Sequence, residues 1–333
     1  MRPAGRSPSP RSPEDWPPEV RRICVRSSID ASEQPAMAWV APQQNEPMPL
    51  LVGLHTWSAG YDSSVNGAVY ARWAIQRGWH FVHPHFRGPN HTPESMGSDL
   101  AVQDILDAVR ELQRTADVDE RRIYLIGSSG GGHMALLLAG RHPGVWGGVS
   151  AWVPIADIAT WHSQHARKPG SCYADRIESA LGGPPDQGRR LAEAAHRSPV
   201  TWLAHAKDVP LDINHGVHDG RRGSVPFSHS LIAFNAIASP QEQLLDRDIE
   251  EYYRTQGRPQ TWAGPEVDSL YGDNPVLFRK VSGNARVTIF DGAHEILYTP
   301  ALNWLAQQRR GERVRWEIAN PESIKSTDTS SGL

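Results

Sequence analysis

The sequence has little cysteine and no marked excess of one charge sign. Its 333 residues include only two cysteines, Cys24 and Cys172, too few for a disulfide framework. The 34 Lys+Arg and 37 Asp+Glu residues give a formal net charge of −3, whereas binders of nucleic acid or membrane surfaces normally show a basic excess. We therefore expect no nucleic acid and no membrane among the partners.

Long apolar runs are also missing. No stretch approaches the ~20 apolar residues that a membrane-spanning helix needs. The first 19 residues are rich in Pro, Ser and Arg and lack the apolar centre of a secretory signal, and the pair Arg21-Arg22 is followed by polar residues. We predict a cytoplasmic protein with a flexible tail over residues 1–19 and a second disordered tail over the Ser/Thr-rich residues 320–333.

Tryptophan, in contrast, is abundant: there are 12 Trp residues against 8 Tyr and 6 Phe. Short apolar runs alternate with longer amphipathic ones, a pattern typical of an α/β fold in which helices cover both faces of a mostly parallel sheet. The predicted strands are 37–41, 50–55, 80–83, 122–126, 147–152, 210–214 and 286–290, and the predicted helices are 68–76, 98–115, 134–140, 228–237 and 301–308. Residues 153–207 and 239–284 interrupt this alternation, and we interpret them as lid-like insertions into one domain over residues 20–319.

A glycine-rich turn follows the predicted strand RRIYLI and precedes the apolar helix MALLLAG. Within it Gly127, Ser129 and Gly131 match G-x-S-x-G in the strand, turn and helix setting of a nucleophile elbow. Only small flanking residues allow so tight a turn, which presents the serine hydroxyl above the sheet. Ser128 lacks a glycine two residues upstream, and no Lys-Ser/Thr pair follows as in a phosphate-binding loop. The sequence predicts Ser129 as a nucleophile, the alternative being a plain glycine-rich turn.

A serine nucleophile needs a histidine to take its proton and an acid to orient that histidine. After such an elbow the partners follow in the order acid, then histidine. Asp219 comes shortly after the predicted strand 210–214, and His294 comes shortly after the strand 286–290, so both are expected at the same edge of the sheet. We predict Asp219 as the acid and His294 as the base.

Four segments resemble the α/β-hydrolase superfamily and, within it, the prolyl oligopeptidase-like serine hydrolases. They are FRGPN (86–90), the run VDERRIYLIGSSGGGHMALLLAG, INHGVHDG and DGAHE, and the resemblance covers about residues 36–310. It implies an α/β-hydrolase fold with Ser129, Asp219 and His294 as the triad. In the family a Val-Pro pair usually follows the acid after two residues, whereas Val225-Pro226 comes later here. Asp212, inside the predicted strand, is therefore kept as the alternative acid.

Hydrogen-bond donors for an oxyanion are expected from two backbone positions. One is Gly130, directly after the nucleophile, and the other is in the loop after strand 50–55, where we choose Trp57 over Thr56. Trp57 and Trp152 both follow strands at the expected site edge, so we interpret them as a substrate platform, with ordinary core packing as the alternative.

Arg87, within FRGPN, is predicted either to reach the pocket as a substrate-binding residue or to tie down its own loop. His83 and His85 have an H-x-H spacing, but no set of carboxylates completes a ligand set, so we expect no metal and no other cofactor.

The function predicted from these residues is a serine hydrolase that cleaves small, aryl or carbohydrate-linked carboxylic esters through an acyl-enzyme. The alternative is a serine peptidase or aminopeptidase of the prolyl oligopeptidase type. Only about 35 residues precede the first predicted core strand, whereas a β-propeller uses about 40 to 50 residues per blade, so we expect no propeller and favour the ester. The expected partner is a small-molecule ester, and a homo-oligomer is compatible with the sequence.

Overall fold

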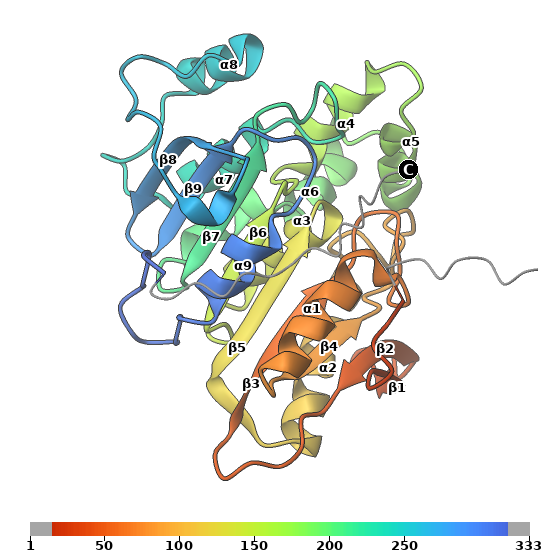
Figure 1. Ribbon diagram of the computed structural model, residues 1–333. Helices are drawn as coiled ribbons and strands as arrows, with labels where there is room; N and C mark the ends of the chain where they lie inside the picture. The colour runs from red at the N-terminus through yellow and green to blue at the C-terminus, as the bar shows by residue number, and fades with distance from the viewer. Residues whose placement is uncertain (1–14, 319–333) are drawn as a thin grey trace, which may run out of the picture.

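The computed structural model describes residues 15–318 and contains a nine-stranded mixed sheet in that part of the chain (Figure 1). The strand order is β1-β2-β4-β3-β5-β6-β7-β9-β8. The consecutive neighbours in the run β4-β3-β5-β6-β7-β9 pair parallel. The outer pairs, β1 with β2, β2 with β4 and β8 with β9, are antiparallel. The strands are β1 (Arg21–Arg26), β2 (Glu33–Trp39), β3 (Met48–Leu54), β4 (His80–Pro84), β5 (Val118–Ser128), β6 (Gly148–Trp152), β7 (Leu211–Gly216), β8 (Val276–Ser282) and β9 (Ala285–Phe290).

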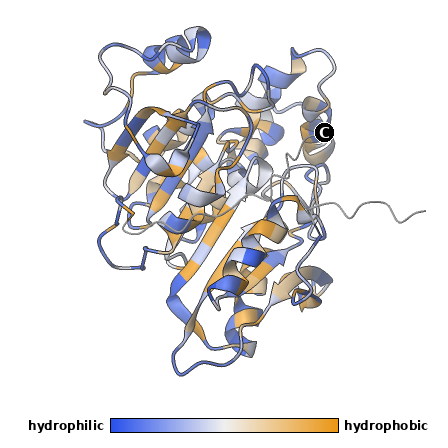
Figure 2. Cartoon of the chain, viewed as in Figure 1, coloured by the Kyte–Doolittle hydropathy of each residue, from blue (hydrophilic) through white to orange (hydrophobic). Residues whose placement is uncertain are grey.

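Helices cover both faces of this sheet, as the alternating pattern predicts. The helices are α1 (Ser64–Gln76), α2 (Asp99–Thr115), α3 (Gly130–Arg141), α4 (Ile158–Ala166), α5 (Tyr173–Leu181), α6 (Gly188–His196), α7 (Ser228–Ile237), α8 (Asp246–Thr255) and α9 (Tyr298–Leu305). One core cluster joins α2, α3 and α7 to the sheet, and a second joins α1 and α9 to the opposite face. Figure 2 shows the central strands mainly in the hydrophobic colours and the loops mainly in the hydrophilic ones. The predicted α/β fold is confirmed.

The alternation of side chains along the strands explains the two-sided core. In β3, Leu50, Val52 and Leu54 contribute to one cluster while Leu51 contributes to the other. Successive side chains of a strand point to opposite faces, so a strand buried on both faces reads as a continuous apolar run. Helix α2 has the expected amphipathic pattern and begins at a capping residue, because the Ser98 side chain accepts a hydrogen bond from the backbone N–H of Ala101.

Two strands were not predicted, and both lie at the sheet edges. β1 (RRICVR) and β8 (VLFRKVS) carry arginine and lysine and are only partly buried, so they lack the apolar run of a central strand. β8 lies inside the predicted insertion 239–284 and pairs with β9, so the last part of that stretch belongs to the sheet. Helix α9 begins at Tyr298, earlier than predicted, because a proline is tolerated in the first turn of a helix.

The insertion 153–207 folds into α4, α5 and α6, which form a small core together with residues from other segments. Its buried members are Trp57, Met96, Ile155, Ile158, Trp161, Ile177, Ala180, Ala194 and Val225. Helix α8, from the second insertion, lies at one extremity of the molecule on the side of β8 (Figure 1). Most of the predicted N-terminal tail and all of the C-terminal one lie outside the described residues, but Trp16 packs against Phe81 and His83 of β4.

Candidate active site

Ser129 lies on a sharp turn between β5 and α3. Its backbone has φ 57° and ψ −120°, outside the regions that non-glycine residues normally occupy. A Cβ atom at Gly127 would lie 2.4 Å from the backbone of Gly131, and one at Gly131 would lie 2.6 Å from the carbonyl oxygen of Leu54. The flanking glycines are therefore required because strand and helix approach so closely, which is the geometry of a nucleophile elbow.

The backbones of Gly130, directly after Ser129, and of Trp57 lie in contact. A Cβ atom at Gly130 would lie 2.5 Å from the backbone nitrogen of Trp57, so the two chain segments touch at this point. Neither of their backbone N–H groups has a hydrogen-bond partner within residues 15–318. Unpaired donors beside a serine hydroxyl are what an oxyanion hole requires. The structure thus brings together the two residues whose N–H groups the sequence predicted as donors.

Asp219 and His294 meet at the same edge of the sheet. The Nδ1 atom of His294 lies 2.5 Å from Oδ2 of Asp219, and the carboxylate is fully buried. The backbone N–H groups of Gly220 and Val225 donate to the other oxygen, Oδ1. Burial alone would raise the pKa of Asp219, but hydrogen bonds from His215 and His294 hold it well below its usual value. The carboxylate therefore stays ionised and favours the tautomer of His294 that leaves Nε2 unprotonated.

His215 is a second histidine on this carboxylate, and sequence reasoning missed its role. It is completely buried at the end of β7, and its Nε2 lies 3.0 Å from Oδ2 of Asp219, while Nδ1 accepts from the hydroxyl of Ser230 at 2.7 Å. Asp219 is thus held by donors on both of its oxygens. The only sequence signal was the position of His215, at a strand end four residues before the acid.

The alternative acid, Asp212, lies elsewhere. It is completely buried within β7, where Oδ1 accepts from Arg286 of β9 at 2.7 Å and Oδ2 accepts from Asn214 at 2.8 Å. This pair joins neighbouring strands inside the sheet and makes no contact with His294.

Ser129 and His294 line one pocket of about 400 Å³ at the carboxyl edge of the sheet. The other lining residues are Thr56, Trp57, Ser58, Val65, Asn66, Ser128, Tyr173, Glu295, Ile296 and Tyr298. Part of the wall is a hydrogen-bonded chain, in which the Tyr298 hydroxyl donates to Asn66 at 2.7 Å and Asn66 donates to the Ser128 hydroxyl at 2.9 Å. Tyr173 reaches this pocket from α5, so the first insertion borders the site.

Two residues predicted to bind substrate are placed outside this pocket. Trp152 is completely buried in the core, where it packs against Tyr271 and Phe290, so its interpretation as a platform is wrong. Arg87 bonds Asp104 and Asp30 and ties down its own loop instead of reaching the pocket. For both residues the structure shows the alternative interpretation, core packing for Trp152 and a tie to its own loop for Arg87, because strand and loop position alone does not determine where a long side chain points.

Trp57 stays at the site, although its ring is not an open platform. It is only 2% exposed and packs edge-to-face on Trp161 with ring centroids 4.7 Å apart. Its side chain therefore forms only a small part of the pocket wall.

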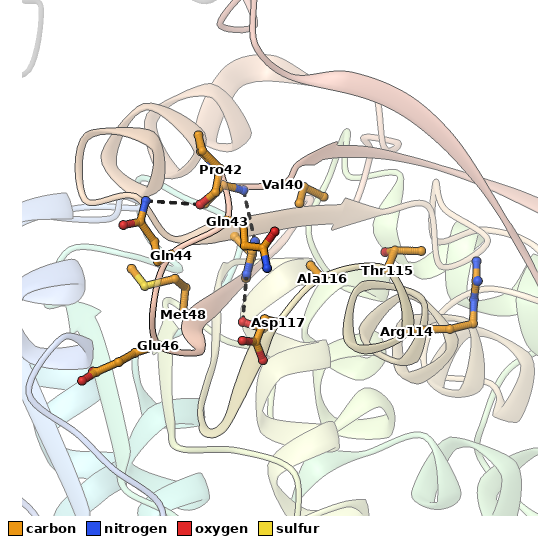
Figure 3. A pocket seen from close by; sticks show the side chains of 12 residues that line it. Val40, Pro42, Gln43, Gln44, Glu46, Met48, Arg114, Thr115, Ala116 and Asp117 are labelled. Atoms are coloured by element: carbon orange, nitrogen blue, oxygen red, sulfur yellow. Dashed lines mark hydrogen bonds between the residues drawn. The ribbon is translucent and has the colours of Figure 1, made fainter.

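A larger cavity of about 480 Å³ lies at the opposite, amino edge of the sheet, near the beginnings of β3, β4 and β5 (Figure 3). Gln43, Met48, His80, Arg114 and Asp117 are among its lining residues. None of the predicted catalytic residues reaches this cavity.

The elbow, the parallel sheet and the order of the site residues along the chain define an α/β-hydrolase fold. Residues 69–251, more than half of the chain, match the model of the prolyl oligopeptidase family. The chain belongs to this family, as the sequence resemblance predicted.

Solved structures show the same fold. The acylaminoacyl peptidase of Pyrococcus horikoshii matches with a TM-score of 0.62 and 15% identity over 90% of this chain and 43% of the other. An acylaminoacyl peptidase in complex with Z-Gly-Gly-Phe-chloromethyl ketone matches with a TM-score of 0.61, 15% identity and the same coverage. A structure from a study of two prolyl endopeptidases has a TM-score of 0.53 at 16% identity, covering 69% of this chain and 33% of that one.

The chain thus spans less than half the length of these structures. Comparison with curated protein sequences gives no match. No helix within residues 15–318 combines the length and the apolar character that crossing a membrane requires.

Proposed function

We propose that this chain hydrolyses carboxylic esters through an acyl-enzyme formed on Ser129. His294 takes the proton of the Ser129 hydroxyl at Nε2 while the serine oxygen attacks the ester carbonyl. The N–H groups of Trp57 and Gly130 stabilise the resulting oxyanion, and His294 then protonates the departing alcohol. Water, activated by the same imidazole, releases the acid and restores the serine.

One observation carries this proposal. Ser129, on a strained elbow beside two unpaired N–H groups, shares a pocket with His294, whose Nδ1 lies 2.5 Å from the buried carboxylate of Asp219. A nucleophile, a base, an acid and an oxyanion site are needed together for acyl transfer. Any one of these features alone would have a structural explanation.

The pocket favours a small or aryl ester as the substrate. Its volume of about 400 Å³ lies toward the small end of the range of about 300–1,000 Å³ for ligand sites, so it suits a single acyl or alkoxy group. Tyr173 and Tyr298 supply aromatic surface beside Ser129. An alcohol is also a better leaving group than an amine, so an ester demands less of the general acid than a peptide bond does.

Peptide hydrolysis is the second candidate, and family membership favours it. The prolyl oligopeptidase family is named for peptidases, and the fold likeness includes acylaminoacyl peptidases. A peptidase would use the same residues with an amine as the leaving group.

A comparison of matched substrates separates the two candidates. The purified chain is assayed with nitrophenyl esters of short acids and with aminoacyl nitroanilides, each with Ser129→Ala as the blank. We expect kcat/KM for the esters to exceed that for the anilides by more than the difference in their intrinsic reactivity. Turnover of an anilide at a competitive rate would establish the peptidase, and loss of neither activity in Ser129→Ala would contradict both candidates.

A further inference from the structure

The loop of residues 220–225 wraps around the carboxylate of Asp219. The N–H groups at its two ends, from Gly220 and Val225, donate to Oδ1 at 2.7 and 3.1 Å. A Cβ atom at Gly223 would lie 2.1 Å from the same oxygen and 2.8 Å from Cβ of His294, so the loop touches both members of the pair. The residues that separate Asp219 from Val225-Pro226 therefore pack directly onto the acid and base.

Trp161 and His165 of helix α4, and Lys168 just after the helix, hold this loop in place. The carbonyl oxygen of Ser224 accepts from Nε1 of Trp161 at 2.8 Å and lies 2.6 Å from Nε2 of His165. The ammonium group of Lys168 donates to the carbonyl oxygen of Gly223 at 2.8 Å. Three side chains of the first insertion thus fix the backbone on either side of the Ser224 side chain.

The Ser224 side chain reaches the reactive nitrogen of His294. Its Oγ lies 3.3 Å from Nε2, whereas no hydrogen bond joins Ser129 to His294 within the described residues. Because Nδ1 faces the ionised Asp219, Nε2 carries the lone pair and accepts the proton of a hydroxyl. Only one such lone pair lies in the plane of an imidazole, so Ser224 and Ser129 compete for it.

We propose that Ser224 is a positioning residue that holds His294 before substrate binds, and that its hydroxyl must leave Nε2 so that the hydroxyl of Ser129 can take its place when the nucleophile is activated. This inference rests on the proposed function, since it assigns a resting partner to the base of that reaction. No bond is made or broken in the exchange: one hydroxyl leaves the lone pair of Nε2 and another replaces it. By occupying Nε2 of His294, the loop of residues 220–225 makes Ser129 less nucleophilic before substrate binds than it would be with the triad alone.

Removal of the Ser224 hydroxyl should therefore speed the attack of Ser129 on a small electrophile. The second-order rate of labelling by a fluorophosphonate is expected to rise about two- to tenfold in Ser224→Ala, the effect of one lost neutral hydrogen bond. Ser224→Thr keeps a hydroxyl and should label at about the wild-type rate. A purely structural role for Ser224 predicts slower labelling of the alanine variant, so the direction of the change distinguishes the two roles.

Lys168→Met is the matched control for loosening of the loop, because it removes the anchor at Gly223 but keeps the Ser224 hydroxyl. We expect it to label more slowly than Ser224→Ala. The proposal is overturned if Ser224→Ala labels no faster than the wild type, if Ser224→Thr labels as fast as Ser224→Ala, or if Lys168→Met matches Ser224→Ala. Ser129→Ala is run in parallel, and an unlabelled wild type would instead reject Ser129 as the nucleophile and the proposed function with it.

Discussion

The two edges of the sheet carry cavities of similar size but of different construction. The carboxyl-edge pocket, of about 400 Å³, contains a residue with left-handed backbone at Ser129, unpaired N–H groups and a buried ionised acid nearby. The amino-edge cavity, of about 480 Å³, is larger, yet no lining residue has a positive φ. Its buried histidine, His80, satisfies backbone groups, since Nδ1 accepts from the N–H of Ala41. Volume thus distinguishes the edges poorly, whereas strain and unpaired donors mark the site.

The largest expected difference between the edges is at Ser129. Ser129→Ala should lower kcat for an ester at least about 10⁴-fold, because the nucleophile is lost and only the oxyanion site remains. Initial rates with a nitrophenyl ester measure this loss.

Neighbouring positions provide the controls. Ser128→Ala alters a hydroxyl in the same pocket that bonds to Asn66, and Thr115→Val alters the amino-edge cavity. We expect less than about tenfold loss in the first and almost none in the second. A loss at Thr115 comparable to that at Ser129 would break the comparison between the edges.

Substitution of one buried aspartate, Asp219, should lower activity, whereas substitution of the other, Asp212, should lower stability. Asp219→Asn is expected to lower kcat about 10⁴-fold, because the amide favours the wrong tautomer of His294. Asp212→Asn should leave the activity of the folded protein almost unchanged but lower the free energy of unfolding by about 3 to 5 kcal/mol, because Arg286 loses its buried partner. Ester assays and urea unfolding of both variants test this, and a larger activity loss in Asp212→Asn would mean that the acid is wrongly assigned.

Closing the oxyanion site should have a smaller effect. Gly130→Ala places a methyl group against the backbone of Trp57, and we expect kcat to fall about 10²- to 10³-fold as the two N–H donors separate. Gly144→Ala, near the amino edge, meets no atom within 4 Å and should be neutral. Equal activities of the two variants would argue that the N–H pair plays no part in the reaction.

A low pH should lower the free energy of unfolding through the buried histidines near the carboxyl edge. Burial lowers the pKa of His55 and His133 to about 4 and that of His83 and His229 to about 3. Below pH 6.5 the unfolded chain takes up protons that the folded chain does not, so the stability present above pH 6.5 is lost as the pH falls toward 4. The slope approaches about 1.4 kcal/mol per pH unit for each histidine.

Urea unfolding between pH 7 and pH 4.5 measures this slope. His229→Gln removes one titrating group while keeping an acceptor for the N–H of Ala156 that His229 now binds, so its slope should be shallower. Parallel curves for the variant and the wild type would contradict the assignment of His229 as a neutral buried histidine.

Much of the site could be predicted from sequence because its parts are local. The elbow needs only a strand, a turn of small residues and an apolar helix, all contiguous around Ser129. Asp219 and His294 each follow a strand closely, and the carboxyl ends of parallel strands meet at one edge. The edge strands β1 and β8 escaped prediction because their partly exposed, charged sequences lack an apolar run.

The sequence by itself therefore determined the fold class, the serine on the elbow and the sheet edge at which Asp219 and His294 lie, since strands and turns depend on short contiguous segments. The tertiary structure decided which side chains point where. It buried Trp152 in the core, paired Arg87 with Asp30 and Asp104, and placed His215 on Asp219 and Ser224 on His294. These contacts depend on how insertions and neighbouring strands pack, and no local pattern specifies the partner that a distant segment will supply.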